Sequence, residues 1–502
     1  MTIKKNLVAN YLGVAWSSVM SIIFLPFYLH YIGAEGYGLI GFFTMLSVSL
    51  SSLDAGLGAV AAREASGYIG ANDQRKHEIG TLLHSIEILM YGISLIIGLS
   101  VAFCAPLIVR YWLNVPENLM SSATWAVGWM GLTIAMQFPT SFYCGCLNGF
   151  QKQVGLNATN IVGSTLRGGG AVLILWLISP TVESYFAWQV LGALGMLIAF
   201  RVLFVKNLEV KRVKLRFSLQ SLIRVRHFLG GMGAINITAL LLTQLDKIIL
   251  SSALPLASFG YYSLAWMLGN TLTARLTGPV FTAYYPKITQ LKELINTELM
   301  LKSYRQGCKL MSIVVVPISL WLALFSHDIL LLWSQNKTLA DEASGALVVI
   351  AIGTMLNAFM HIPYAMQLAH SFTRLALVQN VVSVILIAPM TWYLATHYNL
   401  TVAALPWIIV NAGGVFIAAP LMHRYLGLGG LKDWYVHSLL LPILYAGCSI
   451  LVIKVLWMML IGHKFFILLL PISLAVSLLL AIYTSKLVGY MELNEWKAKL
   501  RF

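Results

Sequence analysis

The chain has 502 residues, of which 59% are hydrophobic and only 10% are Asp, Glu, Lys or Arg. An ordinary soluble domain has about 25% charged residues, so this chain cannot build a water-facing surface for its length. Its mean hydropathy of +0.80 is typical of an integral membrane protein. The composition excludes a soluble, disordered, nucleic-acid-binding or disulfide-scaffold protein, even though the formal net charge is +15.

Apolar runs long enough to cross a bilayer recur along the whole chain. A transmembrane helix needs about 20 apolar residues, and backbone within lipid is either helical or part of a closed barrel. The sequence lacks the alternating pattern of a barrel, so we predict an all-α polytopic membrane protein with about 14 transmembrane helices. The predicted spans are 9–30, 39–62, 81–104, 122–147, 155–178, 184–205, 229–252, 260–283, 307–332, 343–368, 375–396, 402–422, 438–460 and 465–485.

The positions of Lys and Arg support this topology. The apolar run after Lys4 and Lys5 is read as a retained first span rather than a signal peptide. With the N-terminus in the cytoplasm, the loops on that side contain 25 of the 33 Lys and Arg residues, and the external loops contain three. Because cytoplasmic loops are enriched in Lys and Arg, we predict that both termini are cytoplasmic. Most of the net charge then reflects topology and contact with anionic lipids.

The predicted spans also repeat. A shift of 222 residues aligns spans 2 to 6 with spans 8 to 12 and places Gly56 on Gly278. Six spans in each half give both halves the same orientation, related by a pseudo-twofold axis along the membrane normal. We predict two six-helix bundles around a central cavity, plus two C-terminal helices. The predicted organisation is an N-terminal lobe at 1–205, a basic cytoplasmic linker at 206–227, a C-terminal lobe at 228–422, and two further helices with a cytoplasmic tail at 423–502.

No pattern in the sequence indicates enzymatic chemistry. Cys144 and Cys146 are two residues apart and point to different faces of a helix, so a metal site is not expected. His and Cys do not cluster at metal-ligand spacing, and no P-loop or dinucleotide fingerprint is present. We predict no catalytic residues, no metal and no cofactor, and therefore a protein that is not an enzyme.

Ionisable residues inside spans are the main candidates for function, because each costs roughly 2.5–3.5 kcal/mol at the helix centre and normally faces a wet cavity or a partner. In the fifth span, Asn157, Asn160, Ser164 and Arg167 are spaced 3, 4 and 3 residues apart, which places them on one helical face. Arg167 lies at the centre of this span. We interpret it as a contact for an anionic substrate, with a structural hydrogen-bond hub as the alternative.

The seventh span carries a weaker version of this pattern. Asn236, Gln244 and Lys247 provide polar groups on or beside one face. Asp246 points about 100° away from Lys247, so we expect that it cannot neutralise Lys247 as a helix-face pair. Lys247 is therefore a second candidate cation of the cavity, although pairing with Asp246 from a neighbouring turn or another helix remains an alternative.

Other polar residues complete the candidate site. Asp54 and Arg275 lie at similar depth and nearly superpose under the 222-residue shift, which suggests a structural or gating ion pair. We place Arg275 among the cavity cations, and Asn357 and His361 among the polar lining residues. The candidates for gating or ion coupling are Asp54, Asp246 and Glu87, with snorkelling to the inner face as the other interpretation of Glu87.

Three segments resemble polysaccharide exporters of the multidrug/oligosaccharidyl-lipid/polysaccharide (MOP) superfamily. They are HYIGAEGYGLIGF (His30–Phe42), CLNGFQKQVGLN (Cys146–Asn157) and LDKIIL (Leu245–Leu250). The chain is most similar to Wzx-type O-antigen flippases. The resemblance implies a bacterial inner-membrane protein that moves undecaprenyl-pyrophosphate-linked oligosaccharide to the outer leaflet by alternating access, coupled to an ion gradient. It also implies contacts with membrane lipids, a polysaccharide polymerase and a chain-length regulator, and a role for cavity cations.

Three other functions are compatible with the pattern of spans. A drug/cation antiporter of the same superfamily is expected to have uncompensated acids in its cavity, whereas here the excess is basic. An O-antigen polymerase or ligase usually has a long external loop with functional Arg and His. The longest external loop predicted here, 106–121, contains Arg110 alone. An uncoupled scramblase is the third alternative.

Overall fold

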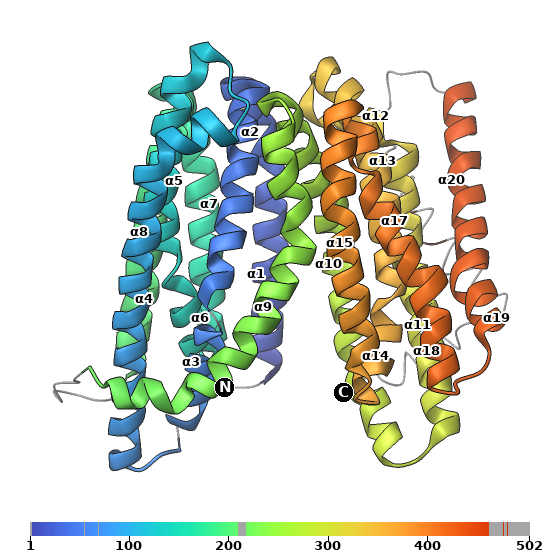
Figure 1. Cartoon of the computed structure of the whole chain (residues 1–502), viewed down its shortest axis with the longest axis horizontal. Helices are drawn as coiled ribbons and strands as arrows, with labels where there is room; N and C mark the ends of the chain where they lie inside the picture. Colours follow the sequence, from blue (N-terminus) through green and yellow to red (C-terminus); the bar gives the residue numbers. More distant parts are fainter. Residues whose placement is uncertain are drawn as a thin grey trace. The chain divides into compact units, whose positions relative to one another are not determined.

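The structure is a computed structural model that describes residues 3–54, 56–68, 70–208 and 217–460, together with residues 475 and 479. Across these residues the chain is helical, and its one β-bridge joins Asn114 and Pro255. The chain divides into two compact units, Met1–Gly260 and Tyr261–Phe502. Within each unit, the long helices lie side by side (Figure 1). The boundary between the units therefore lies one long helix after the predicted linker at 206–227. The pseudo-twofold relation between the two halves stays a prediction.

Ten helical segments in the described part of the chain are long and apolar enough to cross a membrane. This confirms the prediction of an all-α polytopic membrane protein. The count of about 14 is not confirmed. The predicted run 9–30 corresponds mainly to a shorter apolar helix, Leu12–Ile23, and the runs 229–252 and 260–283 fall in long helices that are not among the ten. The predicted run 465–485 lies almost wholly outside the described residues.

In its described residues, the first unit contains nine α-helices connected mostly by short turns. Within it, α3 packs against α6, α4 against α5, and α7 against both α1 and α8. The elements are α1 (Ile3–Ile23), α2 (Leu25–Ser51), η1 (Ser52–Asp54), α3 (Leu57–Tyr68), α4 (Asp73–Leu107), η2 (Ile108–Trp112), η3 (Glu117–Leu119), α5 (Met120–Gln137), α6 (Thr140–Gly149), α7 (Gln153–Leu177), α8 (Val182–Asn207) and α9 (Leu219–Ala253).

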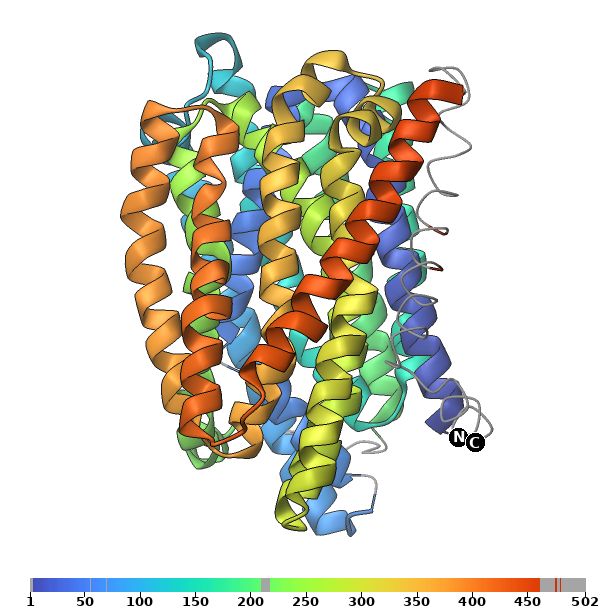
Figure 2. The same ribbon diagram turned by 90° about the vertical axis from the view of Figure 1, so that its right-hand side faces the viewer.

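The second unit has longer helices at its start and more helix breaks towards its end (Figure 2). The helix α10 (Leu256–Glu293) begins in the first unit and continues into the second. The remaining elements are α11 (Thr297–Leu324), α12 (Ser326–Ser334), α13 (Lys337–Phe359), α14 (His361–Ala369), α15 (Thr373–His397), α16 (Leu400–Ala403), α17 (Leu405–Gly413), η4 (Gly414–Ala418), α18 (Ala419–Tyr425), α19 (Leu431–Trp434), η5 (Tyr435–Leu440) and α20 (Leu441–Leu460).

Several predicted continuous spans are broken helices, and local sequence explains the breaks. Proline lacks a backbone N–H and clashes with the preceding turn, so it starts helices more readily than it continues them. Pro26 follows the break between α1 and α2, Pro139 lies between α5 and α6, and Pro406 lies at the start of α17. The predicted runs 122–147 and 402–422 are therefore made of more than one helix each.

A sharp turn at Gly33 separates the first two predicted spans. Gly33 has φ +71° and ψ −174°, so α2 contains two helical stretches on either side of it. Residues with a Cβ rarely adopt this backbone conformation, whereas glycine does so readily. The sequence HYIGAEGYG thus forms the turn between these two helical stretches.

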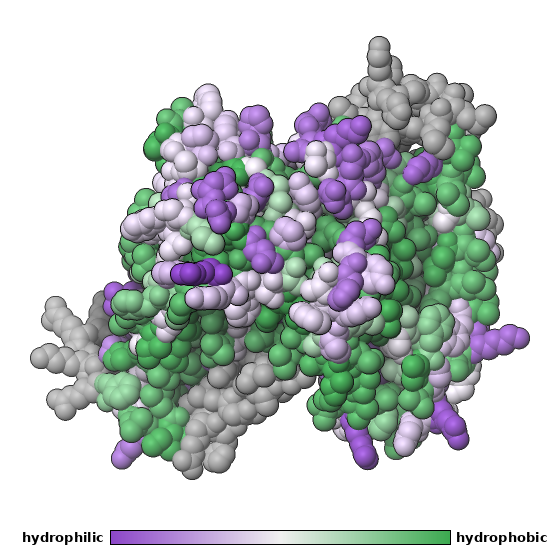
Figure 3. Space-filling model, turned by 45° about the horizontal axis from the view of Figure 1, so that its top comes forward, coloured by the Kyte–Doolittle hydropathy of each residue, from purple (hydrophilic) through white to green (hydrophobic). Residues whose placement is uncertain are grey.

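Apolar side chains cover the outer flanks of the helices. In the space-filling view, hydrophobic residues dominate the visible flanks and hydrophilic residues gather towards the helix ends (Figure 3). Examples are Leu95, Ile96 and Phe103 on α4, which are 61%, 66% and 79% exposed. Such surfaces are expected where helices face acyl chains rather than water.

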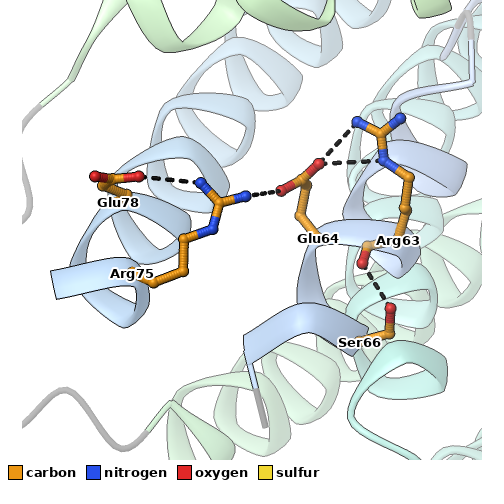
Figure 4. A network of polar contacts seen from close by, with 5 residues as sticks. All are labelled: Arg63, Glu64, Ser66, Arg75 and Glu78. Carbon is orange, nitrogen blue, oxygen red and sulfur yellow. Dashed lines mark hydrogen bonds and ion pairs between the residues drawn. The ribbon is translucent and has the colours of Figure 1, made fainter. Parts of the chain in front are cut away.

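An ion-pair network joins the end of α3 to the start of α4 (Figure 4). Glu64 contacts Arg63 at 2.7 Å and Arg75 at 3.8 Å, and Arg75 also contacts Glu78 at 3.0 Å. These residues and Ser221 of α9 line a small cavity of about 170 Å³. Two of the arginines that support the predicted topology are therefore also paired with acids. Both are about half exposed, so each pair contributes little to stability.

The turn at Gly33 gives the first testable prediction. We expect Gly33→Ala to destabilise the protein by about 1–2 kcal/mol, because an L-residue with a Cβ is strained at this positive φ. A Cβ at this site would meet nothing closer than 3.7 Å, so the loss would come from backbone strain. The measurement is thermal unfolding in detergent, with Gly128→Ala in α5 as the control, since a Cβ there meets nothing within 4 Å. Equal unfolding temperatures for the two variants would contradict the role of Gly33.

Candidate functional site

Arg167 lies near the middle of α7. It follows Gln153, the first residue of the helix, by 14 positions and precedes Leu177, the last, by 10 positions. At 1.5 Å per residue these separations are about 21 Å and about 15 Å. The guanidinium group is thus carried by the central part of a helix that is long and apolar enough to cross a membrane.

Neutral amide oxygens hold the Arg167 guanidinium. Its Nε donates to Oε1 of Gln189 on α8 at 3.0 Å. With the amide oxygen of Gln137 on α5 directed at the guanidinium, this oxygen accepts from Nη2 at 2.8 Å and from Nη1 at 3.2 Å. Three helices of the first unit therefore converge on this group. Because guanidinium has five N–H donors, these contacts leave donors for a further acceptor.

The surroundings of Arg167 include two tyrosines and a close helix contact. Tyr28 donates through its hydroxyl to the carbonyl of Gly168 at 2.9 Å, and its ring meets that of Tyr185 edge to face with centroids 5.1 Å apart. The stem of Arg167 crosses α8 at Gly192, where a Cβ would lie only 2.5 Å from Cγ of Arg167. Glycine at this position lets the two helices approach closely.

In the described part of the chain, Arg167 forms no ion pair. Its positive charge is solvated by side-chain dipoles and is not cancelled by a carboxylate. A charge that is stabilised in this way keeps its field, and it can attract an anion in a region of low dielectric constant. This is the electrostatic property that distinguishes Arg167 from the other buried ionisable residues described below.

The other polar residues of the α7 stripe have mainly local partners. Asn157 is buried, and its Nδ2 donates to Oδ1 of Asn10 at 2.5 Å and to the carbonyl of Gln153 at 2.8 Å. Ser164 donates back to the carbonyl of Ile161 at 3.0 Å. Asn160 is half-buried. Asn157 therefore joins α7 to α1, and its amide is largely satisfied within the protein.

Lys247 is paired with the residue beside it, so the expectation that Asp246 cannot neutralise it is wrong. Lys247 is 7% exposed, and its Nζ contacts Oδ1 and Oδ2 of Asp246 at 3.0 and 3.1 Å and the carbonyl of Thr243 at 2.8 Å. The angle of about 100° between adjacent positions fixes only where the side chains start. The flexible four-carbon stem of lysine lets the ammonium group bend back to the carboxylate.

For two other candidates on α9, the structure gives less detail of the side chain. Gln244 is buried, 9% exposed. Asn236 belongs to α9, and its side chain lies outside what the structure describes. The role predicted for these residues stays a prediction.

Glu87 is buried and held by neighbouring side chains, so the interpretation that it snorkels to the membrane surface is wrong. Its Oε1 accepts from the hydroxyl of Tyr143 at 2.6 Å and from Nε of Arg201 at 3.3 Å. His84 lies 3.5 Å from the other oxygen, and the hydroxyls of Tyr91 and Tyr143 are 2.9 Å apart. Glu87 is 8% exposed, and this network joins α4, α6 and α8.

Asp54 lies at a break in the second span. Its Oδ1 accepts from the backbone N–H of Gly56 at 2.9 Å, and Gly56 has φ +83°. This contact satisfies one N–H that the interrupted helix leaves free. Broken helices in transporters commonly lie at ion or substrate sites. The Asp54–Arg275 pair stays a prediction because the two residues belong to different units.

The candidates of the second unit occupy different environments. Asn357 donates to Oδ1 of Asn411 at 2.8 Å, which links α13 to α17. His361 is half-buried and meets the ring of Phe281 edge to face, with centroids 6.4 Å apart. Arg275 is exposed on α10 and makes no hydrogen bond or ion pair with the residues of the described ranges.

The sequence analysis did not identify some residues that contact the charged groups of the site. Gln189 is a single amide in an apolar span, and it is 5% exposed. A lone buried polar residue in a membrane helix signals a partner, but only the structure shows that this partner is Arg167. The same is true of Tyr143 and Arg201 around Glu87.

Comparison with known proteins places these observations in a family. The sequence profile described as "Polysaccharide biosynthesis protein" matches residues 3–292, more than half of the chain. The chain belongs to this family. No curated protein matches the sequence. The matched residues include Arg167, Lys247 and the network around Glu87.

Solved structures share the fold. The lipid II flippase MurJ in an inward closed conformation has a TM-score of 0.66 and 13% identity, over 96% of this chain and 99% of that chain. An inward-facing multidrug resistance MATE family transporter of the MOP superfamily has a TM-score of 0.63 and 14% identity, over 84% and 95%. A MATE transporter of Vibrio cholerae has a TM-score of 0.52 and 15% identity, over 85% and 98%.

The protein therefore has the fold of a MOP-superfamily transporter and of a lipid II flippase, in agreement with the fold that the three sequence segments predict. The chain is thus a multi-pass membrane protein of the polysaccharide-biosynthesis family. The solved structures that share its fold are transporters and flippases rather than enzymes, in agreement with the prediction that the chain is not an enzyme.

The Lys247–Asp246 pair gives the second prediction. We expect Asp246→Asn to destabilise the protein by about 3–5 kcal/mol, because it removes the carboxylate from a buried ammonium group. The double variant Asp246→Asn/Lys247→Met should recover much of this loss, since the charge is removed together with its partner. Unfolding temperature in detergent measures both. A double variant that is no more stable than Asp246→Asn would contradict this role for the pair.

Proposed function

We propose that the protein is a flippase that moves undecaprenyl-pyrophosphate-linked oligosaccharide from the cytoplasmic to the periplasmic leaflet of the bacterial inner membrane. The oligosaccharide is an O-antigen or similar repeat unit, and the transport follows an alternating-access cycle coupled to an ion gradient. The observation that carries the proposal is Arg167, a charged group near the middle of α7 that is held by the neutral amides of Gln137 and Gln189.

The chemistry of the substrate matches this arrangement. The polyprenyl tail is soluble in the hydrocarbon layer, whereas the pyrophosphate carries a charge that the layer excludes. Guanidinium is planar, remains protonated and binds phosphate oxygens in a bidentate manner. A cation without a bound carboxylate can compensate the negative charge of the pyrophosphate. It does so near the middle of the membrane, where burying that charge costs most free energy.

The paired acids argue against the nearest rival. A drug/cation antiporter of the same fold requires negative charge that is available to a cationic substrate. In the described ranges, Glu87 is bound to Arg201 and Asp246 is bound to Lys247. Asp54 has no ion pair there and accepts from the N–H of Gly56, so two of the three candidate acids are paired with a cation. The available charge near Arg167 is positive, which favours an anionic substrate. A role for Arg275 in binding, and a polymerase and a chain-length regulator as partners, belong to the same proposal, whereas the pairing of Lys247 with Asp246 argues against the binding role predicted for Lys247.

Substitution of Arg167 tests the proposal. We expect Arg167→Met to reduce flipping of lipid-linked oligosaccharide in proteoliposomes about tenfold or more, the range expected when a hydrogen bond to a charged group is lost. Arg167→Lys should retain part of the activity because it keeps the charge and loses the bidentate geometry. Arg110→Met is the matched control, since Arg110 is exposed in η2.

Protein level and unfolding temperature must be equal among these variants. Wild-type flipping by Arg167→Met would remove the basis of the proposal. Transport of cationic drugs by the wild-type protein, without transport of the lipid-linked substrate, would favour the antiporter.

Asp54 provides a separate test of ion coupling. Asp54→Asn keeps an oxygen that can accept from the N–H of Gly56 but removes the charge, whereas Asp54→Ala removes both. If the carboxylate takes part in coupling, Asp54→Asn should fold normally and flip substrate at a rate that no longer responds to an imposed proton or sodium gradient. A gradient response equal to that of the wild type would assign Asp54 to helix capping alone, with a stability loss of about 0.5–2 kcal/mol expected only for Asp54→Ala.

A further inference from the structure

A groove runs along the seam between α7 and α8 and ends at Arg167. Its volume is about 510 Å³, within the range of about 300–1,000 Å³ that is typical of small-molecule sites. On each helix the lining residues recur at helical spacing on one face. They are Ala158, Thr159, Val162, Gly163, Leu166 and Arg167 from α7, and Trp188, Leu191, Gly192, Gly195, Met196 and Ala199 from α8.

The groove has an apolar wall and one ionisable residue. The hydroxyl of Thr159 donates to the carbonyl of Gly155, and Nε1 of Trp188 donates to the carbonyl of Leu166. These polar groups are therefore satisfied within the protein. Leu166 and Leu191 are both 60% exposed beside the groove. An apolar channel with exposed aliphatic edges on a membrane-spanning helix pair accommodates a hydrocarbon chain.

The length of the groove corresponds to one leaflet. On α7 the lining runs from Ala158 to Arg167, a separation of nine residues, and on α8 from Trp188 to Ala199, a separation of eleven. At 1.5 Å per residue these distances are about 14 Å and about 17 Å, close to half of a hydrocarbon core of about 30 Å. One end lies near the start of α7, and the other lies at mid-helix beside the guanidinium.

From this placement we propose that the groove binds the isoprenoid chain of the phosphorylated lipid carrier while its phosphate is at Arg167. The inference rests on the proposed function. Charge complementarity selects this occupant over a resident phospholipid. A resident phospholipid keeps its phosphate at the membrane surface, about 21 Å from Arg167 along α7. A carrier in transit brings its phosphate to mid-membrane, and its chain then continues from Arg167 along the groove.

Small residues shape the groove and provide the means to block it. A Cβ at Gly163 would meet Sδ of Met196 at 2.5 Å, so a larger residue there would have to displace the Met196 side chain. Gly195 is exposed in the groove, and a Cβ there meets nothing within 4 Å. Gly195→Leu therefore fills the groove without a clash at the backbone, and Gly195→Ala fills it only slightly. Gly92→Leu on α4 is the matched control, because Gly92 is also exposed with open space around it.

The experiment uses the full-length protein in nanodiscs and a polyprenyl phosphate with a diazirine in its isoprenoid chain. After illumination, mass spectrometry should locate the label on peptides that contain Leu191–Ala199. We expect Gly195→Leu to reduce this label roughly tenfold, the lower limit for a misfit in an apolar pocket. Gly92→Leu should leave it unchanged, and Gly195→Ala should reduce it less than Gly195→Leu does. A diazirine-labelled phosphatidylglycerol and an uncharged polyprenol with the same diazirine should each label these peptides less than the polyprenyl phosphate does.

Equal labelling by phosphatidylglycerol would show that the groove holds ordinary acyl chains and would overturn the inference. So would equal labelling by polyprenol, because the phosphate would then have no part in binding. Normal flipping and normal labelling by Gly195→Leu would reject the groove while leaving the proposed flippase intact. Specific labelling by polyprenyl phosphate in a wild-type protein that does not flip the lipid-linked oligosaccharide would instead reject the proposed function and retain the binding site.

Discussion

Compensation of buried charge in a low-dielectric layer is the constraint on which the site depends. The first unit meets it in two different ways. Glu87 and Lys247 are bound by groups of opposite charge, so little net field remains around them. Arg167 is bound by two neutral amides and keeps its charge. Both arrangements satisfy hydrogen-bonding groups, but only the second leaves an electrostatic attraction for an external anion. The number of ionisable residues in a span therefore says less about function than the nature of their partners.

The same constraint explains where the helices break. A free backbone N–H within lipid is costly, so an interruption needs a local acceptor or a neighbouring element. At the break after η1, the carboxylate of Asp54 accepts from Gly56 and supplies part of this compensation. The proline-associated breaks fall where a helix can restart without the missing N–H. Broken helices thus retain satisfied backbone groups while placing polar side chains at depths where a continuous apolar helix would have none.

The sequence was sufficient to predict the fold class, because hydrophobic runs of about 20 residues depend on the thickness of the bilayer and not on tertiary contacts. It also identified Arg167, since a central charge in an apolar span is unusual. The partners of that charge were not predictable. Gln189 lies 22 positions away and Gln137 on a different helix, and no periodicity connects them. The Lys247–Asp246 contact was only an alternative in the sequence analysis, because helical spacing describes where side chains begin, whereas a long flexible side chain decides where its charge ends.

The pairing of a solvated cation with an adjacent apolar groove has a physical consequence for any amphipathic lipid. The charged head of such a lipid needs a polar environment, and the hydrocarbon chain attached to it needs an apolar one. The bilayer provides a boundary between these two environments at its surface but not at its centre. In the first unit, Arg167 carries its guanidinium towards the amides of α5 and α8, while the same residue lines the α7–α8 groove. A polar and an apolar environment therefore meet at mid-helix. With this boundary inside the membrane, the phosphate of a lipid can move away from the surface while the lipid's hydrocarbon chain stays in an apolar environment. The free-energy cost of translocation is then mainly the electrostatic cost of burying the phosphate, and this is the cost that the protein has to lower.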